Sequence, residues 1–239
     1  MRLSIILCVL LGLASLAQAQ EGGQRVTVTG CPADGQTGSI AAPPPSSAMA
    51  PIATRVGALG FYRASEGERI LAPRGWHCFS VYGANGRTLF VTPQTVQLGV
   101  GSKLSTITGP LIVVSESYTD TSGRFAAAQV VARLFPKLRG YVQDVMSEGL
   151  VPQEDFVFRP YPADKLTYHG DDVAEFATAS GGKGLGDDLG VVAEDGMAVR
   201  GAAVAINGVV VVAAVRLSPD MNDISTEIVR QVMREPHGR

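Results

Sequence analysis

The sequence predicts an α+β fold in which antiparallel sheets pack against two central helices and one C-terminal helix. Short apolar runs bounded by Gly, Pro or Asn dominate residues 56–118 and indicate strands. Apolar residues three and four positions apart follow residues 122 and 218, which indicates helices. The most apolar stretch beyond the N-terminus, 198–216, carries Asn207-Gly208 at its centre and is typical of an antiparallel hairpin with a type I′ turn.

The first half of the chain is expected to be rich in β-structure. A tight turn is indicated by Gly83-Ala84-Asn85-Gly86, which favours a hairpin between its flanking runs. The expected strands of this half are 58–63, 68–71, 76–82, 88–92 and 110–118.

Helical spacing follows in the second half. Ser122 can cap a helix over 123–135, and Pro136 suits the first turn of a second helix that ends near residue 148. Further strands are expected at 156–159, 166–169 and 173–178. The candidates for the inward face of the first helix are Phe125, Val130, Val131 and Leu134.

The last helix is expected to start at Ser218-Pro219-Asp220, where a capping residue precedes proline. Its apolar residues have the spacing of one buried stripe and predict packing against the sheet. They are Ile224, Ile228, Val229 and Val232.

The N-terminal residues indicate export to the periplasm or beyond. Residues 1–19 combine Arg2, a short apolar run and Ala17-Gln18-Ala19, which is the pattern of a cleaved secretory signal. A segment rich in Pro, Ala, Ser and Gly follows at 20–55, and its part 32–51 is expected to be an exposed excursion. The globular domain is expected at 56–239, as one unit or as a β-rich 56–118 followed by an α+β 119–239.

Two cysteines remain once the signal is removed, Cys31 and Cys78. In an oxidising compartment such a pair predicts a disulfide. The alternative is a reactive Cys78 beside His77, but neighbouring side chains on a strand point to opposite faces.

Charge and hydropathy argue against nucleic-acid binding and against a transmembrane helix. The formal net charge is −2, and no basic block stands out, so phosphate-neutralising nucleic-acid binding is not expected. The apolar run between Arg200 and Arg216 is too short for a transmembrane helix, so none is expected in the mature chain.

Three segments, 70–93, 184–190 and 215–232, resemble a group of exported proteobacterial proteins with no assigned activity. They read ILAPRGWHCFSVYGANGRTLFVTP, GLGDDLG and VRLSPDMNDISTEIVRQV. The resemblance implies a periplasmic or secreted protein. It implies no ligand and no catalytic residue.

The densest cluster of versatile side chains is Arg74, Trp76 and His77. They could form a ligand platform of cation, aromatic face and imidazole, with Lys183 swinging over it from a mobile glycine loop at 181–190. The alternative is a structural role, with Trp76 packed beside the disulfide and His77 in solvent. No HExxH or paired CxxC is present, so we expect neither a metal nor a cofactor.

Catalytic patterns are weak. Ser180 and Lys183 match SxxK, yet two glycines between them oppose the helix that this chemistry needs. The pairs Asp171-Asp172 and Asp187-Asp188 lack calcium-loop spacing, and adjacent acids seldom converge as a glycosidase pair.

Two hypotheses of function remain. The first is a non-catalytic envelope module that binds a protein or envelope component, which the lack of catalytic signatures favours. The second is a hydrolase of cell-envelope material that uses Ser180, Lys183 and His169. The second requires an imidazole within hydrogen-bond reach of a nucleophile in a concave pocket.

Overall fold

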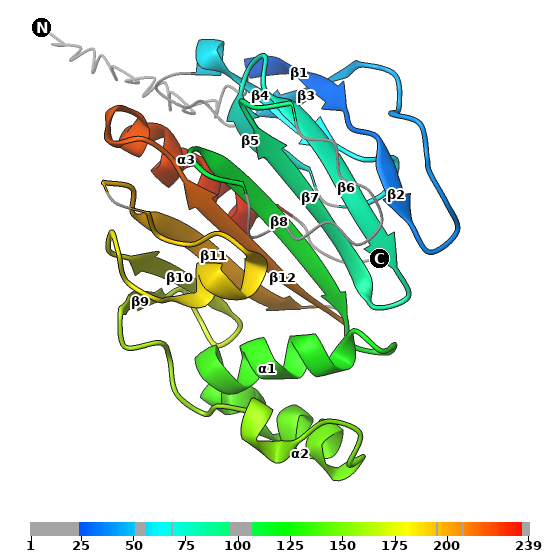
Figure 1. The fold of residues 1–239 in the computed structure, drawn as a ribbon, viewed down its shortest axis with the longest axis vertical. Helices are drawn as coiled ribbons and strands as arrows, with labels where there is room; N and C mark the ends of the chain where they lie inside the picture. Colours follow the sequence, from blue (N-terminus) through cyan, green and yellow to red (C-terminus); the bar gives the residue numbers. More distant parts are fainter. Residues whose placement is uncertain are drawn as a thin grey trace, which may run out of the picture.

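A computed structural model describes residues 24–50, 56–67, 69–95, 107–194, 196–206 and 208–235. Within these residues the chain forms a sheet of four strands, a sheet of eight strands and three α-helices, one of them C-terminal (Figure 1). The signal predicted at 1–19 lies outside the described residues.

The larger sheet is the central layer of the molecule. Its strands, in their order across the sheet, are β2 (Ala33–Gly35), β6 (His77–Gly83), β7 (Gly86–Thr92), β8 (Leu111–Tyr118), β12 (Val209–Arg216), β11 (Val199–Ile206), β10 (Val173–Thr178) and β9 (Asp164–Tyr168). Every residue of β12 is buried, because both faces of the sheet are covered. A strand buried on both faces needs a continuous apolar run, which explains the composition of 198–216.

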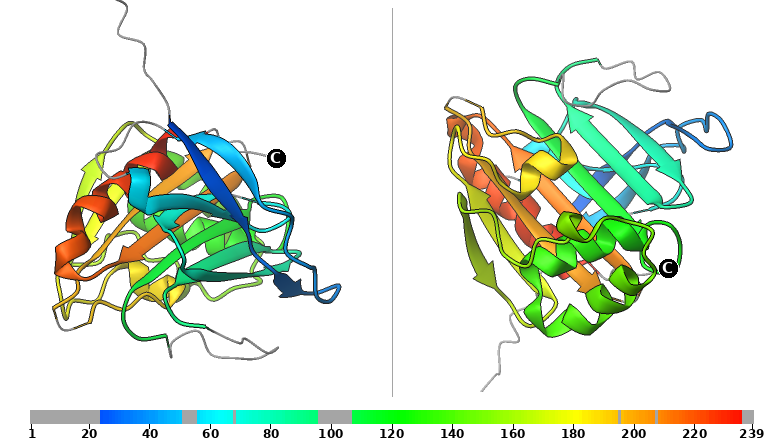
Figure 2. Two further views of the ribbon diagram at one scale, coloured as in Figure 1. Left: turned by 90° about the horizontal axis from the view of Figure 1, so that it is seen from above. Right: turned by 60° about the horizontal axis from the view of Figure 1, so that its bottom comes forward.

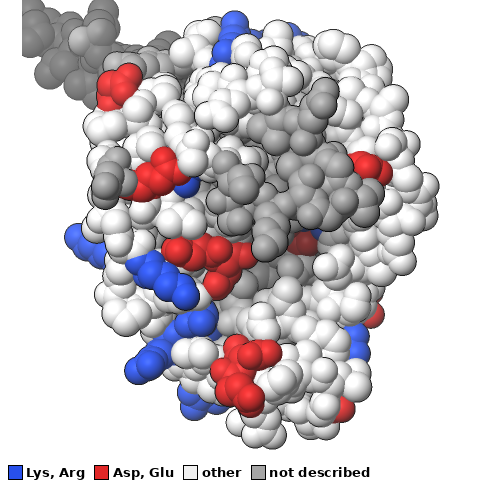
Figure 3. Space-filling view, viewed as in Figure 1, with Lys and Arg blue, Asp and Glu red and all other residues white. Residues whose placement is uncertain are grey.

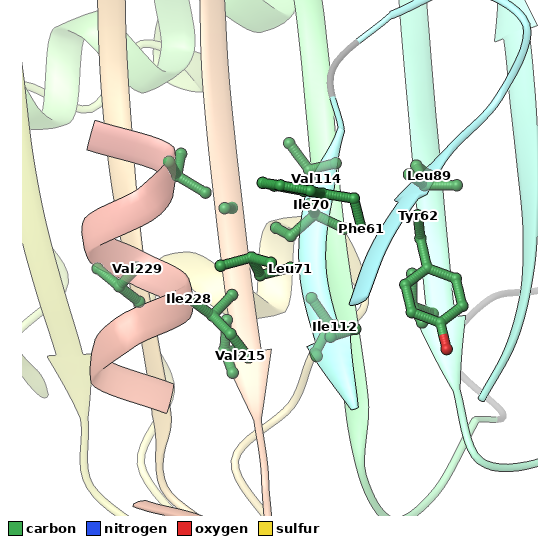
Figure 4. Close-up of a cluster of buried hydrophobic side chains, with 14 of the residues drawn as sticks. Phe61, Tyr62, Ile70, Leu71, Leu89, Ile112, Val114, Val215, Ile228 and Val229 are labelled. Carbon is green, nitrogen blue, oxygen red and sulfur yellow. The ribbon is translucent and has the colours of Figure 1, made fainter. Parts of the chain in front are cut away.

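The smaller sheet and the C-terminal helix cover one face of the larger sheet. The smaller sheet has the order β3 (Ser46–Ala50), β1 (Gln24–Gly30), β4 (Leu59–Arg63) and β5 (Ile70–Pro73), and the helix is α3 (Asn222–Arg234). The first core lies between these layers, where Phe61 and Leu71 meet Ile112, Val215 and Ile228 (Figure 4).

The predicted apolar stripe of the last helix is confirmed. Ile224, Ile228, Val229 and Val232 are all buried in the first core.

The other face of the larger sheet carries α1 (Arg124–Leu134) and α2 (Arg139–Ser147), joined by a 3₁₀ turn over Pro136–Leu138 (Figure 2). A second core lies there, and Val131 of α1 is buried in it together with Phe90, Val113 and Phe176. Of the inward candidates, Val131 and Leu134 are fully buried, whereas Phe125 and Val130 are half-buried at the edge of this core.

The disulfide between Cys31 and Cys78 is confirmed. Cys31 directly follows β1 of the smaller sheet, and Cys78 lies in β6 of the larger one. The bond therefore links the two sheets beside the first core, where Cys31 is fully buried.

The expectation of purely antiparallel sheets is wrong. β1 pairs parallel with β4, and β2 pairs parallel with β6. Both exceptions arise because residues 24–50 supply strands to the two sheets in turn, and β1 and β2 each meet a strand distant in sequence. Residues 32–49 are largely exposed, as expected, yet they include β2 and most of β3.

The second half departs from the expected elements in several places. α3 begins at Asn222, after a 3₁₀ turn at Pro219–Met221, and Ser122 does not cap α1, because the residue before that helix is Gly123. No strand forms over 156–159; the chain makes a 3₁₀ turn at Gln153–Asp155, and Phe156 is buried in the second core. The hairpin of β11 and β12 is confirmed by the pairing of Ile206 with Val209, while Asn207 of its turn lies outside the described residues. β8 pairs with β12 from end to end, so both halves of the chain share one sheet.

Among the helices that the structure describes, none is both long enough and apolar enough to cross a membrane.

Candidate ligand-binding site

A cavity of about 750 Å³ opens between α1 and the face of the larger sheet that carries the second core. Its floor is formed by β6, β7 and β8 and reaches Val212 of β12. Its remaining walls come from the 3₁₀ turn Gln153–Asp155 and from the 3₁₀ helix η5 (Leu185–Leu189). A volume of this size is typical of sites that hold small molecules.

The floor is polar although the strands around it are apolar. Val81, Thr88, Ser115 and Val212 face one another across the four strands and form one row. The hydroxyls of Thr88 and Ser115 share a hydrogen bond of 3.0 Å. Ser117 lies two residues further along β8, on the same face, and its hydroxyl has no partner among the described residues. The row therefore interrupts the apolar face and keeps this end of the sheet open to polar ligands.

One stripe of α1 forms the wall above this floor. It contains Ala126, Gln129, Val130 and Arg133, which have the i, i+3, i+4, i+7 spacing of a single helix face. The neighbouring stripe is buried in the second core and consists of Ala127, Ala128, Val131, Ala132 and Leu134. The helix is thus anchored by one stripe and presents another to the cavity.

Arg133 is the dominant polar group of this wall. Its side chain is only 16% exposed, and its guanidinium lies 4.0 Å from the centre of the Tyr161 ring. Its Nε lies 3.9 Å from Oδ2 of Asp188, which is too long for a hydrogen bond. Among the residues that the structure describes, no acceptor takes a hydrogen bond from this guanidinium. Its five N–H donors are therefore available to a ligand.

Tyr161 and Asp188 hold the guanidinium in place. The Tyr161 hydroxyl donates a hydrogen bond of 2.6 Å to Oδ1 of Asp188. Burial raises the pKa of Tyr161 to about 12, and the bond to Asp188 contributes to that rise. The phenol thus stays protonated at neutral pH and remains a donor to Asp188.

Acidic side chains border the cavity from a separate segment. Glu154 and Asp155 line the cavity from the 3₁₀ turn, and both are exposed. Neither carboxylate has a hydrogen bond or an ion pair within the described ranges. Charged side chains gather on the half of the molecule around β9, η5 and α2 (Figure 3).

Arg87 also borders the cavity, but it is already paired. Its guanidinium lies 3.7 Å from Glu116 and 3.4 Å from Glu66, and it contacts the Tyr118 ring and hydroxyl. Of the two cationic residues that line the cavity, Arg133 is therefore the one whose N–H donors are not used by a described residue. Residues with carboxylates outnumber cationic residues in the lining.

The structure does not gather the four residues of the platform proposed from the sequence. Arg74, Trp76 and His77 lie together where the chain enters β6, and Arg74 donates a 2.7 Å hydrogen bond to the carbonyl of Leu59. Trp76 packs against the first core, and His77 is exposed, with Nε2 3.4 Å from the Thr95 hydroxyl. None of the three lines the cavity.

Lys183 lies on the other side of the larger sheet. Its ammonium group is 5.9 Å from the ring centre of Tyr161, which packs against the second core. Trp76, by contrast, contacts the first core. A joint site of Trp76 and Lys183 is therefore not present.

The glycine loop makes several contacts with the rest of the domain. η5 occupies half of 181–190, and Leu185 is buried in the second core. The Leu185 amide donates a 2.9 Å hydrogen bond to Asp164, whose other oxygen accepts 2.6 Å from Thr178. Asp187 accepts from the Gly184 amide at 2.8 Å, so the two adjacent acids serve different partners.

The remaining catalytic candidates have structural partners. The Ser180 hydroxyl donates to the carbonyl of Glu194 and accepts from the amide of Gly196, both at 2.8 Å. His169 lies 3.5 Å from Glu175 and is 44% exposed, away from the cavity. Asp171 pairs with Lys137 at 2.8 Å.

Metal ligands do not gather in the described part of the chain, where no three His, Cys, Asp or Glu side chains lie close enough to hold an ion.

Sequence reasoning missed the residues that line the cavity. Two signals were present. Thr88, Ser115 and Ser117 are small polar residues on the strand face that carries Phe90 and Val113, and Gln129 and Arg133 are one helical turn apart between apolar neighbours. Neither signal shows which strand face meets which helix face. The placement of these residues around one cavity therefore became visible only in the structure.

Comparison of the chain with protein-family models, with curated proteins and with solved structures found no match.

Proposed function

We propose that the protein is an exported, non-catalytic binding module, and that the cavity between α1 and the larger sheet is its ligand site. The observation that carries the proposal is Arg133: it lines a cavity of about 750 Å³, its side chain is largely buried, and its guanidinium has no hydrogen-bond acceptor among the described residues. Burying polar donors without partners is unfavourable, which favours their use by a ligand.

Export rests on two independent observations. Residues 1–19 have the pattern of a secretory signal, and Cys31 and Cys78 form a disulfide. Structural disulfides persist in oxidising compartments and are rare in the cytosol. Protein recovered from the periplasm should have the mass of a chain that starts at Gln20, whereas an intact Met1 there would contradict export.

The geometry favours binding over hydrolysis. The cavity is lined by the hydroxyls of Thr88, Ser115 and Ser117, but neither His77 nor His169 reaches it. An activated serine requires a base in hydrogen-bond contact. Ser115 instead bonds to Thr88, which gives its hydroxyl a structural partner.

Mass spectrometry under non-denaturing conditions tests the site without knowledge of the ligand. Ala126 is exposed at the cavity, so Ala126→Trp should block it without disturbing the core. Gln143→Trp adds the same ring to an exposed position of α2 outside the cavity. After native purification, wild type and Gln143→Trp should retain the same additional mass, and Ala126→Trp should lose it.

Two results would contradict the proposed site. One is an equal additional mass on all three proteins, because the ligand would then lie elsewhere. The other is the unliganded mass for all three proteins after purification from their own envelope.

A further inference from the structure

We propose that the ligand is a short peptide with a free amino group and a free carboxyl group, bound with its carboxylate on Arg133 and its ammonium between Glu154 and Asp155. This inference rests on the proposed function, because it names the chemistry of the ligand for the same cavity. It follows from the charged residues that line the cavity, from their lack of hydrogen-bond partners among the described residues and from the size of the space.

The guanidinium of Arg133 selects the carboxylate end. Arginine presents a planar fork of donors that matches a carboxylate in a bidentate contact. The Tyr161 ring, 4.0 Å away, and Asp188 restrict its orientation. A phosphate would also satisfy the donors, but the excess of carboxylates around the cavity opposes a dianion more strongly than a single carboxylate.

Glu154 and Asp155 select the amino end. They are consecutive residues of one short turn, both border the cavity, and neither is neutralised by a described cation. An ammonium ion is the group that relieves the repulsion of two neighbouring carboxylates. Because Arg133 lines the same cavity from α1, a ligand that meets both charges is a zwitterion.

The uncharged polar residues of the cavity fit peptide groups. Gln129 and Ser117 also line the cavity, and neither side chain has a hydrogen-bond partner among the described residues. A side-chain amide and a hydroxyl can each donate and accept, as a peptide N–H and C=O require. A volume of about 750 Å³ exceeds what one amino acid fills, so a peptide of a few residues is the better match.

Calorimetric titration with trialanine tests the inference. Wild type should bind trialanine at least about tenfold more tightly than N-acetyl-trialanine or trialanine amide, since each blocked peptide loses one charge contact. In Arg133→Gln, trialanine and its amide should bind equally well, while the preference for a free amino group remains.

The double variant Glu154→Gln and Asp155→Asn should show the reverse pattern. It should lose the preference for a free amino group and keep the preference for a free carboxylate. Arg139→Gln is the matched control, because Arg139 lies over Phe158 in α2 outside the cavity. It should behave as wild type. General damage to the fold would weaken all three peptides together and would not exchange one preference for the other.

Failure of this inference is distinguishable from failure of the proposed function. If diacetylchitobiose, a neutral disaccharide, binds wild type but not Ala126→Trp while trialanine does not bind, the cavity is a ligand site and the peptide inference is wrong. Equal affinities for the free and both blocked peptides would also overturn it. If no probe binds, the peptide inference fails. The mass of the natively purified protein then shows whether the cavity holds another ligand.

Discussion

Arg216 shows how one buried charge can organise several loops. It is the last residue of β12 and is 1% exposed. Its guanidinium donates to the carbonyls of Gly109, Val192 and Ile107 at 2.6–2.7 Å and pairs with Glu194 at 2.9 Å. From the sequence, Arg216 only marked the end of an apolar run. Nothing in that pattern indicates that its side chain turns back into the protein.

Replacing Arg216 with Met should therefore destabilise the protein strongly. Three carbonyls and the Glu194 carboxylate would lose the donor that a buried guanidinium supplies, and breaking such an arrangement costs about 3–5 kcal/mol. Urea denaturation followed by circular dichroism measures the change. Arg230→Met is the control, because Arg230 is exposed, lies 3.9 Å from Glu227 and should contribute less than about 1 kcal/mol. Similar losses for both variants would contradict this account.

The protonation of Tyr161 provides a second prediction for a single residue. Its pKa of about 12 in the folded protein exceeds the ordinary value of 10.0. A raised pKa means that the folded state holds the proton more tightly, so this contribution to stability is complete below pH 10 and is lost as the pH rises to about 12. Asp188→Asn should lower the pKa of Tyr161, because it removes a hydrogen-bonded negative charge.

NMR titration of the labelled tyrosine ring measures that pKa. Burial is the largest cause of its rise, so the value in Asp188→Asn should remain above 10.0. Asp171→Asn, at the Lys137 ion pair, is the control and should leave the pKa of Tyr161 unchanged. An unchanged pKa in Asp188→Asn would exclude the proposed influence of its charge.

At the scale of elements, the glycine loop depends on close packing rather than on flexibility. A Cβ added at Gly184 would lie 2.1 Å from Oδ1 of Asp164 and 2.2 Å from the hydroxyl of Thr178. Gly184→Ala should therefore separate η5 from β9 and β10 and cost about 1–3 kcal/mol. Gly140→Ala meets no atom within 4 Å in α2 and should stabilise the protein by about 0.5–1 kcal/mol.

Thermal unfolding of the two glycine variants gives the sign of each effect. A lower melting temperature for Gly184→Ala with a higher one for Gly140→Ala is expected. Equal stability of wild type and Gly184→Ala would show that the loop can move away from Asp164 without loss, as the sequence analysis expected.

Elements could be predicted from the sequence where periodicity was strong. The spacing from Ile224 to Val232 fits only an amphipathic helix, and the apolar run of 198–216 with its central turn fits only a buried hairpin. β1 to β3 were missed, although residues 25–29 alternate polar and apolar residues, because β2 and β3 lie in a segment rich in Pro, Ala and Ser. β1 and β2 also pair with the distant strands β4 and β6, which a local pattern does not contain.

The whole molecule explains why the candidate site escaped sequence reasoning. Thr88, Gln129, Glu154 and Asp188 come from four separate segments, and only the layered fold brings them to one cavity. The platform at Arg74–His77 is contiguous in sequence and is for that reason easy to notice. In the fold, however, Trp76 packs against the first core and does not line the cavity. A spacing rule finds sites on one helix or one loop and cannot find a site between layers.

The disulfide should determine how firmly those layers are joined. Cys31 and Cys78 are 47 residues apart and connect the smaller sheet to β6 of the larger one. Closing a loop of this length restricts the unfolded chain and contributes about 4 kcal/mol in the chain-entropy treatment. The double variant Cys31→Ala and Cys78→Ala should lose that amount in urea denaturation, and reductant should cause a similar loss in wild type. The double variant itself should be insensitive to reductant. If wild type with a confirmed disulfide has the same stability before and after reduction, the two sheets are held together by the first core alone.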